Sequence, residues 1–357
     1  MMEKTLPEVC IIQYGFPFDS SKFCSAEGVP LVRIRDVVRG YSETYTTEIA
    51  GENYIVNDGD LLIGMDGEFN IAYWKGGRAY LNQRVCRLIP REDVDRDYIF
   101  YYMPQALKAI EDVTPFVTVK HLSAKQLSKI LIPLPDMSEQ QRISAVLRSV
   151  DRVIAMRKKE LDELNNLVKS RFIELFGDYD LTHPQESWVT IKEIGTVVGG
   201  ATPKTDHDEY WGGSYRWITP AELDADSGYI YDSVRKLTKA GVESCSLQEM
   251  PVGTVILSSR APIGKVAIAG NTFYCNQGFK NIICKEGITP RYLYTVLLLN
   301  VEYLNSLGRG ATFKEISKGI VESIRIPVPL MDLQQQFAAF VEQTDKSKLC
   351  GKMEAAA

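Results

Sequence analysis

The sequence has few of the residues that bind metals or build a nucleophilic catalytic site. It contains 3 histidines, His121, His183 and His207, and none of its 7 cysteines forms a C-x-x-C pair. Zinc-site spacing is therefore missing, and the scattered histidines offer no catalytic triad. An odd number of separated cysteines is typical of reduced, packed thiols, so we expect neither a bound metal nor a disulfide.

Long apolar runs are also absent, because no stretch of about 18 residues is apolar enough to span a bilayer. The first ten residues, MMEKTLPEVC, contain acids and a proline where a secretion signal needs a basic start and an apolar stretch. These two absences favour a cytoplasmic protein.

The chain has no excess of positive charge, since its net charge is -5 at pH 7. Proteins that bind DNA attract it with clustered basic groups. A DNA-binding chain of this composition must therefore gather its basic residues on one face, or share the phosphate contacts with a partner protein. We expect the chain by itself to bind DNA weakly.

The motifs of a DNA-modifying enzyme are missing as well. The sequence contains neither an N-P-P-Y or D-P-P-Y motif, which holds a flipped base, nor a glycine-rich cofactor loop. The segment around Gly264-Lys265 resembles a phosphate loop, but Ser259 replaces its first glycine and Val266 its hydroxyl residue. We interpret Gly264-Lys265 as a turn and expect no catalytic site in this chain.

What the sequence does contain is an internal repeat. The segment TVKHLSAKQLSKILIPLPDMSEQQ, from Thr118, aligns with TFKEISKGIVESIRIPVPLMDLQQ, from Thr312, at an offset of 194 residues. The same offset pairs Gly59 with Gly253, and nearer the start of each copy the register slips by about ten residues, which places Ile34 opposite Ile218. A match of this length indicates duplication, and 357 residues are enough for two domains.

Each copy follows one plan, which predicts the domain boundaries. Short apolar runs introduced by glycine, such as GDLLIGM and GTVILSS, predict a β-rich globular stretch. A Thr-x-Lys segment and a strand ending in I-P-x-P follow, and the prolines then end the sheet. The plan predicts β-rich domains at 1–137 and 181–331, a spacer helix at 138–180, and a shortened C-terminal helix at 332–357.

The predicted spacer helix over 138–176 has apolar positions in heptads. Ser138 and Gln141 fit a capping box, and Gly177 fits a C-terminal stop. At about 1.5 Å per residue the helix would be about 58 Å long, which suits a rod between domains. We predict a helix-pair seam at Ile143, Leu147, Val150, Ile154, Leu161, Leu164, Val168, Leu175, Phe337 and Val341.

These features together resemble the specificity subunits of type I restriction-modification systems. The likeness rests on SEQQRISAVLRSVD, on GGATPK with YWGG and WITP, and on CNQGFKNI, and it covers nearly the whole chain. It implies an α+β fold in which two β-rich α/β target-recognition domains are separated by long antiparallel coiled-coil helices. Two departures are Leu333, which stands opposite Glu139 of the E-Q-Q signature, and the absence of T-P-K from the first copy.

The resemblance also implies a function. Each domain would read one half of a bipartite DNA site, and two methyltransferase subunits with S-adenosylmethionine would modify an adenine in each half. A restriction subunit that uses ATP and Mg would join them, and none of the catalysis would lie in this chain. The alternative is a non-catalytic adaptor with two β-rich modules on a coiled coil, which periodicity by itself does not reject.

Candidate DNA contacts follow from comparing the two copies. Residues that differ between the copies are candidates for reading bases, because two half-sites must be distinguished; they are Tyr73, Trp74, Lys75, Arg78, Thr202, Lys204 and Arg260. Residues shared by the copies are candidates for phosphate contact, namely Thr118, Lys120, Thr312 and Lys314. The recurring pairs Asn82-Gln83 and Asn276-Gln277 could bind adenine, but recurrence favours a structural loop.

Overall fold

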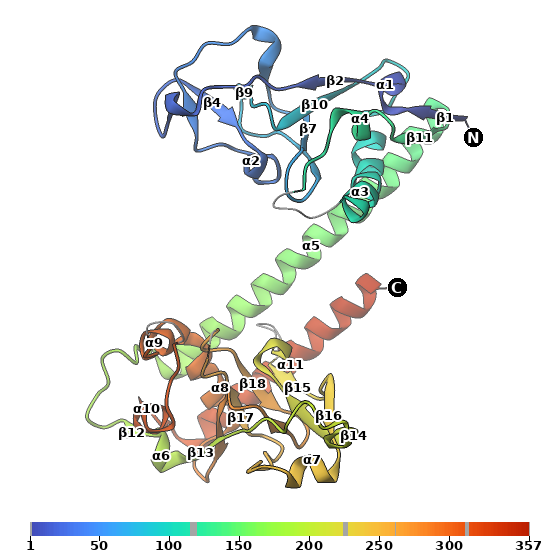
Figure 1. The fold of residues 1–357 in the computed structure, drawn as a ribbon. Helices are drawn as coiled ribbons and strands as arrows, with labels where there is room; N and C mark the ends of the chain where they lie inside the picture. The colour runs from blue at the N-terminus through green and yellow to red at the C-terminus, as the bar shows by residue number, and fades with distance from the viewer. Residues whose placement is uncertain (1, 115–119, 224–227, 261, 311–313, 357) are drawn as a thin grey trace. The chain divides into compact units, whose positions relative to one another are not determined.

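The computed structural model describes residues 2–114, 120–223, 228–260, 262–310 and 314–356, with side chains from Glu3 to Lys348. The chain forms two compact units, Met1–Met156 and Arg157–Ala357. The boundary falls within one continuous helix, α5 (Met137–Phe176), which belongs to both units (Figure 1). The boundary therefore lies inside the segment that the sequence predicts as a spacer.

The first unit is built on three sheets. Its strands are β1 (Met2–Thr5), β2 (Cys10–Tyr14), β3 (Phe23–Cys24), β4 (Val29–Val32), β5 (Tyr45–Thr46), β6 (Ile55–Val56), β7 (Leu61–Gly64), β8 (Asn70–Tyr73), β9 (Ala79–Leu81), β10 (Val85–Pro90) and β11 (Leu131–Leu134). They are ordered β3-β5-β4-β9-β6, β2-β10-β7-β8 and β1-β11. The helices besides α5 are α1 (Leu6–Val9), α2 (Ile34–Arg39), α3 (Arg96–Val113) and α4 (Ala124–Leu127).

The second unit repeats this plan. Its strands are β12 (Val189–Thr190), β13 (Gly195–Gly199), β14 (Trp211–Ile218), β15 (Tyr229–Ile230), β16 (Arg235–Leu237), β17 (Val255–Leu257), β18 (Val266–Ala269), β19 (Tyr274–Cys275), β20 (Lys280–Cys284) and β21 (Arg325–Ile326). They are ordered β13-β20-β17-β18-β15, β16-β14-β19 and β12-β21. The helices are α6 (Ile191–Ile194), α7 (Lys239–Glu243), α8 (Pro290–Leu299), α9 (Val301–Ser306), α10 (Lys318–Ser323) and α11 (Met331–Ala356).

Strand pairing corrects the alignment of the two copies. In the first unit Val32 pairs in parallel with Leu81, and in the second unit Ile218 pairs in parallel with Cys275. Because Leu81 and Cys275 are 194 residues apart, Ile218 corresponds to Val32, and the predicted match with Ile34 is wrong by two residues. Side chains alternate with a period of 2 along a strand, so a slip of two residues keeps the apolar pattern and is invisible in sequence.

A side-chain hydrogen bond confirms the corrected register. The Arg33 backbone N–H donates to the Asp36 carboxylate at 2.9 Å, and the Thr219 N–H donates to the Glu222 carboxylate at 2.9 Å. Both bonds satisfy the start of a short helical turn directly after the parallel strand. Arg33 therefore corresponds to Thr219.

The start and end of α5 are set by different residues from the capping box that the sequence predicts. The Asp136 carboxylate accepts a hydrogen bond from the Glu139 N–H at 2.9 Å, so the cap is Asp136 and the predicted Ser138 cap is wrong. Ser138 lies inside the first turn because β11 ends at Leu134, two residues before Asp136, and α5 begins directly after Asp136. At the other end Gly177 has φ +93°, which confirms the predicted stop.

The second residue of the E-Q-Q signature, Gln140, joins α5 to the first unit. Its side chain is 1% exposed. Its amide oxygen accepts from the Asp95 N–H at 2.9 Å, while its NH₂ group donates to the carbonyls of Pro135 and Asp93 at 2.9 and 3.3 Å. We call this arrangement the glutamine latch.

The same latch recurs in the second unit, 194 positions further along the chain. The buried amide of Gln334 accepts from the Thr289 N–H at 2.8 Å and donates to the carbonyls of Pro329 and Gly287 at 2.9 and 3.0 Å. The side chain of the first signature residue, Glu139, by contrast forms an exposed ion pair with Arg142. Replacement of the signature glutamate by Leu333 therefore removes no contact on which the latch depends.

Within the second unit, the end of α5 packs antiparallel to α11. Phe172 and Phe176 pack edge-to-face against Phe337 with ring centroids 5.4 and 5.6 Å apart, and Arg171 lies over the Phe340 ring. As positions on α5 decrease toward Asn165, their neighbours on α11 increase toward Lys348. Of the predicted seam, Phe337 and Val341 are buried, and Val168 and Leu175 pack against the same core. The coiled coil itself stays a prediction.

The middle of α5 does not match the predicted seam. Val150 and Ile154 are 48% and 46% exposed, so the first unit does not bury them. Phe172 and Phe176, which are outside the predicted seam, are instead the most deeply buried apolar residues of the helix. A straight helix has 3.6 residues per turn, so a heptad seam drifts around it, and contact with a globular core selects other positions.

Several smaller features are set by local contacts. Gly264 has φ +89° in the connection between β17 and β18, which confirms a turn at Gly264-Lys265. The six cysteines whose side chains are described are free thiols, and burial raises the pKa of Cys10, Cys86, Cys275 and Cys284 to about 12. Among the described residues no helix is apolar enough over 18 residues to cross a membrane, and no cluster suits a metal ion.

Candidate nucleic-acid interface

The aromatic residues predicted to read bases in the first unit are largely packed inside it. Trp74 is 1% exposed within a core cluster, and its indole N–H donates to the Gly77 carbonyl at 2.7 Å. Trp74 therefore cannot contact a base in this conformation, and its prediction is wrong. Gly76 and Gly77 bring the chain back over the ring, because a Cβ added to Gly76 would lie 2.5 Å from the indole. An isolated sequence segment does not reveal that closure.

Tyr73 is half-buried at the end of β8. Its ring packs against Phe100 at 4.8 Å, the Arg96 guanidinium lies over it at 5.2 Å, and its hydroxyl donates to the Asp97 carboxylate. Burial raises the pKa of the Tyr73 hydroxyl. These contacts give Tyr73 a structural role. Its base-reading role stays a prediction, and a base would have to displace these contacts.

The two cations of the same segment are exposed. The Lys75 ammonium forms no hydrogen bond or ion pair within the described residues, although its backbone N–H donates to the Gly40 carbonyl at 3.3 Å. Arg78 is exposed too, and its guanidinium forms an ion pair with the Glu52 carboxylate at 2.9 Å. An exposed pair of this kind contributes roughly 0–1 kcal/mol, so Arg78 can exchange Glu52 for DNA at little cost.

The predicted readers of the second unit are all at its surface. The Thr202 hydroxyl donates to the Gln277 side-chain oxygen at 2.6 Å. Lys204 is exposed, and its carbonyl accepts from the Trp211 indole at 3.2 Å. Arg260 is 47% exposed and pairs with Glu315 at 3.0 Å. The structure places Thr202 beside one of the recurring glutamines and Arg260 beside the Thr-x-Lys segment.

The phosphate candidates are only partly described. Thr118 and Thr312 lie outside the described residues. Lys120 donates to the Glu111 carbonyl at 2.8 Å and is 3.6 Å from the Glu111 carboxylate, so its ammonium already has partners. Lys314 is exposed and forms no hydrogen bond or ion pair within the described residues. Of the two lysines, Lys314 is the more available for a phosphate.

An equivalent β-bridge follows the Thr-x-Lys segment in each unit. The side-chain charges of the bridging residues are opposite in the two units. Asp66 bridges His121 in the first unit, and Arg260 bridges Glu315 at the equivalent positions of the second. Arg84 approaches Asp66 at 3.4 Å, while Lys280 binds Glu315 at 3.1 Å. Burial would raise the pKa of Glu315, but hydrogen bonds from Lys280 and Arg260 hold it below its usual value. The bridge is common scaffold, whereas its charges are individual to each unit.

The recurring Asn-Gln pairs follow β9 and β19, where a glycine packs against the backbone. A Cβ added to Gly15 would lie 2.1 Å from the Asn82 carbonyl oxygen, and one added to Gly200 would lie 2.0 Å from the Cys275 carbonyl oxygen. Only glycine allows these approaches, which supports the interpretation of both pairs as structural loops. The two asparagine side chains nevertheless differ. The Asn276 oxygen accepts from the Gly278 N–H at 2.9 Å, and Asn82 forms no such bond within the described residues.

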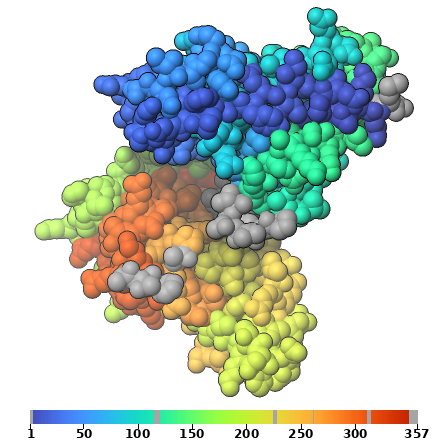
Figure 2. Space-filling model, turned by 45° about the horizontal axis from the view of Figure 1, so that its top comes forward, coloured from blue at the N-terminus to red at the C-terminus, as the bar shows by residue number. Residues whose placement is uncertain are grey.

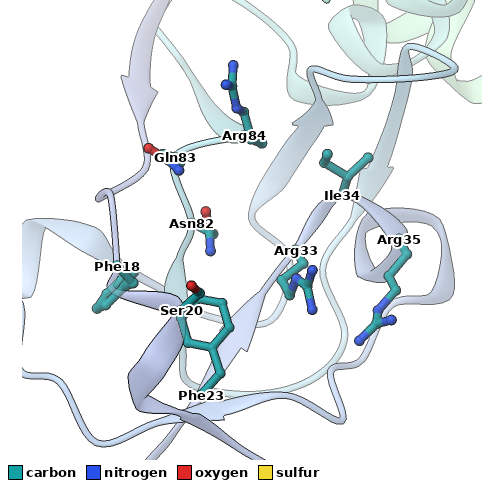
Figure 3. Close-up of a pocket in the computed structure, with 9 residues that line it drawn as sticks. All are labelled: Phe18, Ser20, Phe23, Arg33, Ile34, Arg35, Asn82, Gln83 and Arg84. Carbon is teal, nitrogen blue, oxygen red and sulfur yellow. The ribbon is translucent and has the colours of Figure 1, made fainter. Parts of the chain in front are cut away.

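Asn82 lies in a groove that the sequence comparison missed. The groove has a volume of about 510 Å³ and is shown in Figure 3. Three segments surround it: the loop before β3, the junction of β4 and α2, and the turn between β9 and β10. Its lining residues are Phe18, Ser20, Phe23, Arg33, Ile34, Arg35, Asn82, Gln83 and Arg84. Figure 2 shows the surface of the unit that carries it in blue to cyan.

The three arginines of this groove have no counterpart in the second unit. In the corrected register Arg33, Arg35 and Arg84 correspond to Thr219, Ala221 and Gly278. The equivalent place is also more closed, because a Cβ at Gly278 would lie 3.2 Å from the Pro220 ring. The segment VRIRDV contains two of these arginines and could have indicated the groove. The alignment error of two residues, however, paired its first arginine with Trp217.

Comparison with known proteins connects these two units to one family. The family described as "Type I restriction modification DNA specificity domain" matches residues 1–166 and again residues 186–352. The chain belongs to this family. The two matches coincide with the two structural copies, which confirms the α+β internal repeat.

Relatives of the chain are also specificity subunits by name. It is 42% identical over 185 residues to the type I restriction enzyme MjaIX specificity subunit of Methanocaldococcus jannaschii. The aligned region covers 50% of this chain and 43% of that protein. It is 40% identical over 167 residues to the EcoBI specificity subunit of Escherichia coli, which covers 46% of this chain and 35% of that protein. The chain thus spans less than half the length of these two relatives.

Solved structures share the fold over nearly the whole chain. The type I restriction-modification S subunit from M. genitalium superposes with a TM-score of 0.59 at 14% identity, covering 99% of this chain and 92% of that one. A chain from a structure on complex assembly and conformational transition of the type I R-M system gives a TM-score of 0.56 at 18% identity, with the same coverage of both chains. At this identity the likeness shows the fold alone.

Proposed function

We propose that this chain is the specificity subunit of a type I restriction-modification complex and that each unit reads one half of a bipartite site in double-stranded DNA. The observation that carries the proposal is duplication with local divergence. The glutamine latch, the Thr-x-Lys bridge and the Asn-Gln loop recur, while the side chains presented beside them differ. A shared frame with individual surface residues suits two readers of different sequences.

The partner enzymes belong to the same proposal. Two methyltransferase subunits with S-adenosylmethionine would methylate an adenine in each half-site, and restriction subunits with ATP and Mg would complete the complex. The family is a DNA specificity domain, not a catalytic one, and we assign this chain no reaction of its own. A complex that acts on host DNA would work in the cytoplasm.

The middle of α5 supports docking of a partner. Its exposed apolar side chains occur at helical spacing, and they are Val146, Val150, Val153, Ile154 and Met156. Exposed apolar patches of this kind mark interaction surfaces in soluble proteins. We assign the stripe to the methyltransferase subunits. The adaptor alternative is not favoured, because the family and the relatives are named for DNA specificity.

Mapping of methylated adenines tests the proposed function. The chain and its methyltransferase partner would be expressed in a host without other adenine methyltransferases, and the genome would be sequenced with base-modification detection. We expect one motif with two specified parts and an unspecified gap. Cells with the methyltransferase alone are the control. A continuous motif, or no motif, would contradict the proposal.

A further inference from the structure

We propose that Asn82 reads an adenine of the first half-site from the groove of the first unit, with Arg33 holding the adjacent backbone phosphate. This inference rests on the proposed function and names the ligand chemistry of one site within it. It separates Asn82 from Asn276, which the sequence repeat treats as equivalent.

The first support is the state of the Asn82 amide. The residue is 8% exposed, yet its side chain forms no hydrogen bond within the described part of the chain. Figure 3 shows the amide between Arg33 and the loop of Phe18 and Ser20, facing the groove. Most side-chain amides in such a recess are bonded within the protein, whereas the Asn82 amide keeps both its donor and its acceptor for a ligand that enters the groove. The second-unit asparagine meets that rule by binding the Gly278 N–H.

The second support is the chemistry that an amide needs. A side-chain amide has an oxygen that accepts and an NH₂ group that donates. A phosphate only accepts, so it would leave the Asn82 oxygen without a donor. The major-groove edge of adenine offers an N6 donor beside an N7 acceptor, which matches both halves of the amide. The edges of guanine and thymine lack that donor, so the amide favours adenine.

The third support is the charge around the amide. The Arg33 guanidinium contacts the Phe23 ring at 5.8 Å and forms no hydrogen bond or ion pair within the described residues. By contrast, the Arg35 guanidinium donates to the Thr44 hydroxyl. The Arg84 guanidinium lies 3.4 Å from the Asp66 carboxylate. Arg33 therefore has its donors free, and a phosphate beside a recognised base supplies the acceptors that an arginine needs.

The fourth support is the contrast with the second unit. There the equivalent of Arg33 is Thr219, whose hydroxyl and N–H both point to Glu222. Pro220 and Gly278 approach one another where the first unit is open. The groove is thus individual to the first unit, as a base-reading site for one half of a split target must be.

The test compares two isosteric substitutions at repeated positions, Asn82→Asp and Asn276→Asp, in the assembled complex with methyltransferase. Aspartate keeps the acceptor and loses the donor, so Asn82→Asp cannot bind adenine N7. We expect it to reduce discrimination at one A·T pair of one half-site by about 5- to 150-fold. Asn276→Asp keeps the acceptor for the Gly278 N–H, so the motif should stay unchanged.

Arg33→Lys and Arg33→Ala give the second measurement. Lysine keeps the charge, so Arg33→Lys should preserve the motif, while Arg33→Ala should weaken binding to all sequences and flatten its salt dependence. A motif unchanged by Asn82→Asp, or altered in both half-sites, overturns the assignment of Asn82. A change at a G·C pair overturns the choice of adenine. If the unsubstituted chain yields no bipartite motif, the proposed function itself has failed, which is a separate result.

Discussion

Trp74 and Arg78 lie in one turn of the first unit but occupy opposite environments. The sequence groups them as a flat surface with hydrogen-bond donors, whereas the structure buries the indole and exposes the guanidinium. At the scale of single residues, burial decides which of two adjacent aromatic or basic side chains can meet a ligand. Asn82 illustrates the same point, because its repeat partner Asn276 is bonded within its own loop.

Alanine substitutions separate the two residues. Trp74→Ala removes a buried indole and its hydrogen bond to Gly77, so it should lower the free energy of unfolding of the first unit by about 3–5 kcal/mol. Arg78→Ala breaks an exposed ion pair and should change the free energy of unfolding by less than about 1 kcal/mol. Urea unfolding followed by far-UV circular dichroism measures both. An equally stable Trp74→Ala variant would show that the indole is not part of the core.

At the scale of elements, the latch joins each β-rich fold to the helix that follows it. Figure 1 shows α3 beside the start of α5, and here Ser144 and Arg148 of α5 also bind Asp95 and Asp97 at the start of α3. The helix therefore begins as part of the first unit. Its position is set by buried polar bonds, which depend on direction more strongly than apolar contacts do.

Gln140→Leu tests the latch with Gln141→Leu as its matched control. The first substitution leaves the Asp95 N–H and two carbonyls without their bonds, at a cost of at least about 1–3 kcal/mol. Gln141 is exposed, so its substitution should change stability by about 0.5 kcal/mol or less. Hydrogen exchange should become faster at the amide of Asp95 only in Gln140→Leu. Equal exchange in both variants would argue against the latch.

At the scale of the whole molecule, one unbroken helix of 40 residues runs from the first unit into the second. We propose that its length sets the gap between the half-sites. The residues after Leu161 that pack most tightly, such as Phe172, belong to the core of the second unit. A change of length at Leu161 therefore leaves the core of the second unit intact.

Insertions after Leu161 test the helix as a spacer. Four residues add about 6 Å and roughly one full turn, so the gap should grow by about one or two base pairs, at 3.4 Å each, with both half-sites unchanged. An insertion of two residues turns the second unit by about 200° about the helix axis. Methylation should then be lost although the protein folds. Methylation mapping and circular dichroism check these outcomes. An unchanged gap with full activity in the four-residue variant would exclude the spacer role.

The duplication, the long helix and the family resemblance could all be predicted from the amino-acid sequence. Each of these depends on local patterns: a constant offset, an apolar period close to 3.5, and prolines that end a strand before a helix begins. Gly177 as the end of α5 and the turn at Gly264 were predictable for the same reason, because their positive φ angles suit glycine wherever it stands.

Which members of these patterns contact one another follows from the folded chain and not from local patterns. The parallel pairing of Val32 with Leu81 corrected a register that the period of 2 leaves open, and it brought Arg33 opposite Thr219. Burial of Trp74 and the free amide of Asn82 depend on loops distant in sequence, which enclose one side chain and leave the other open. Such contacts are non-local, so no spacing rule along the chain encodes them.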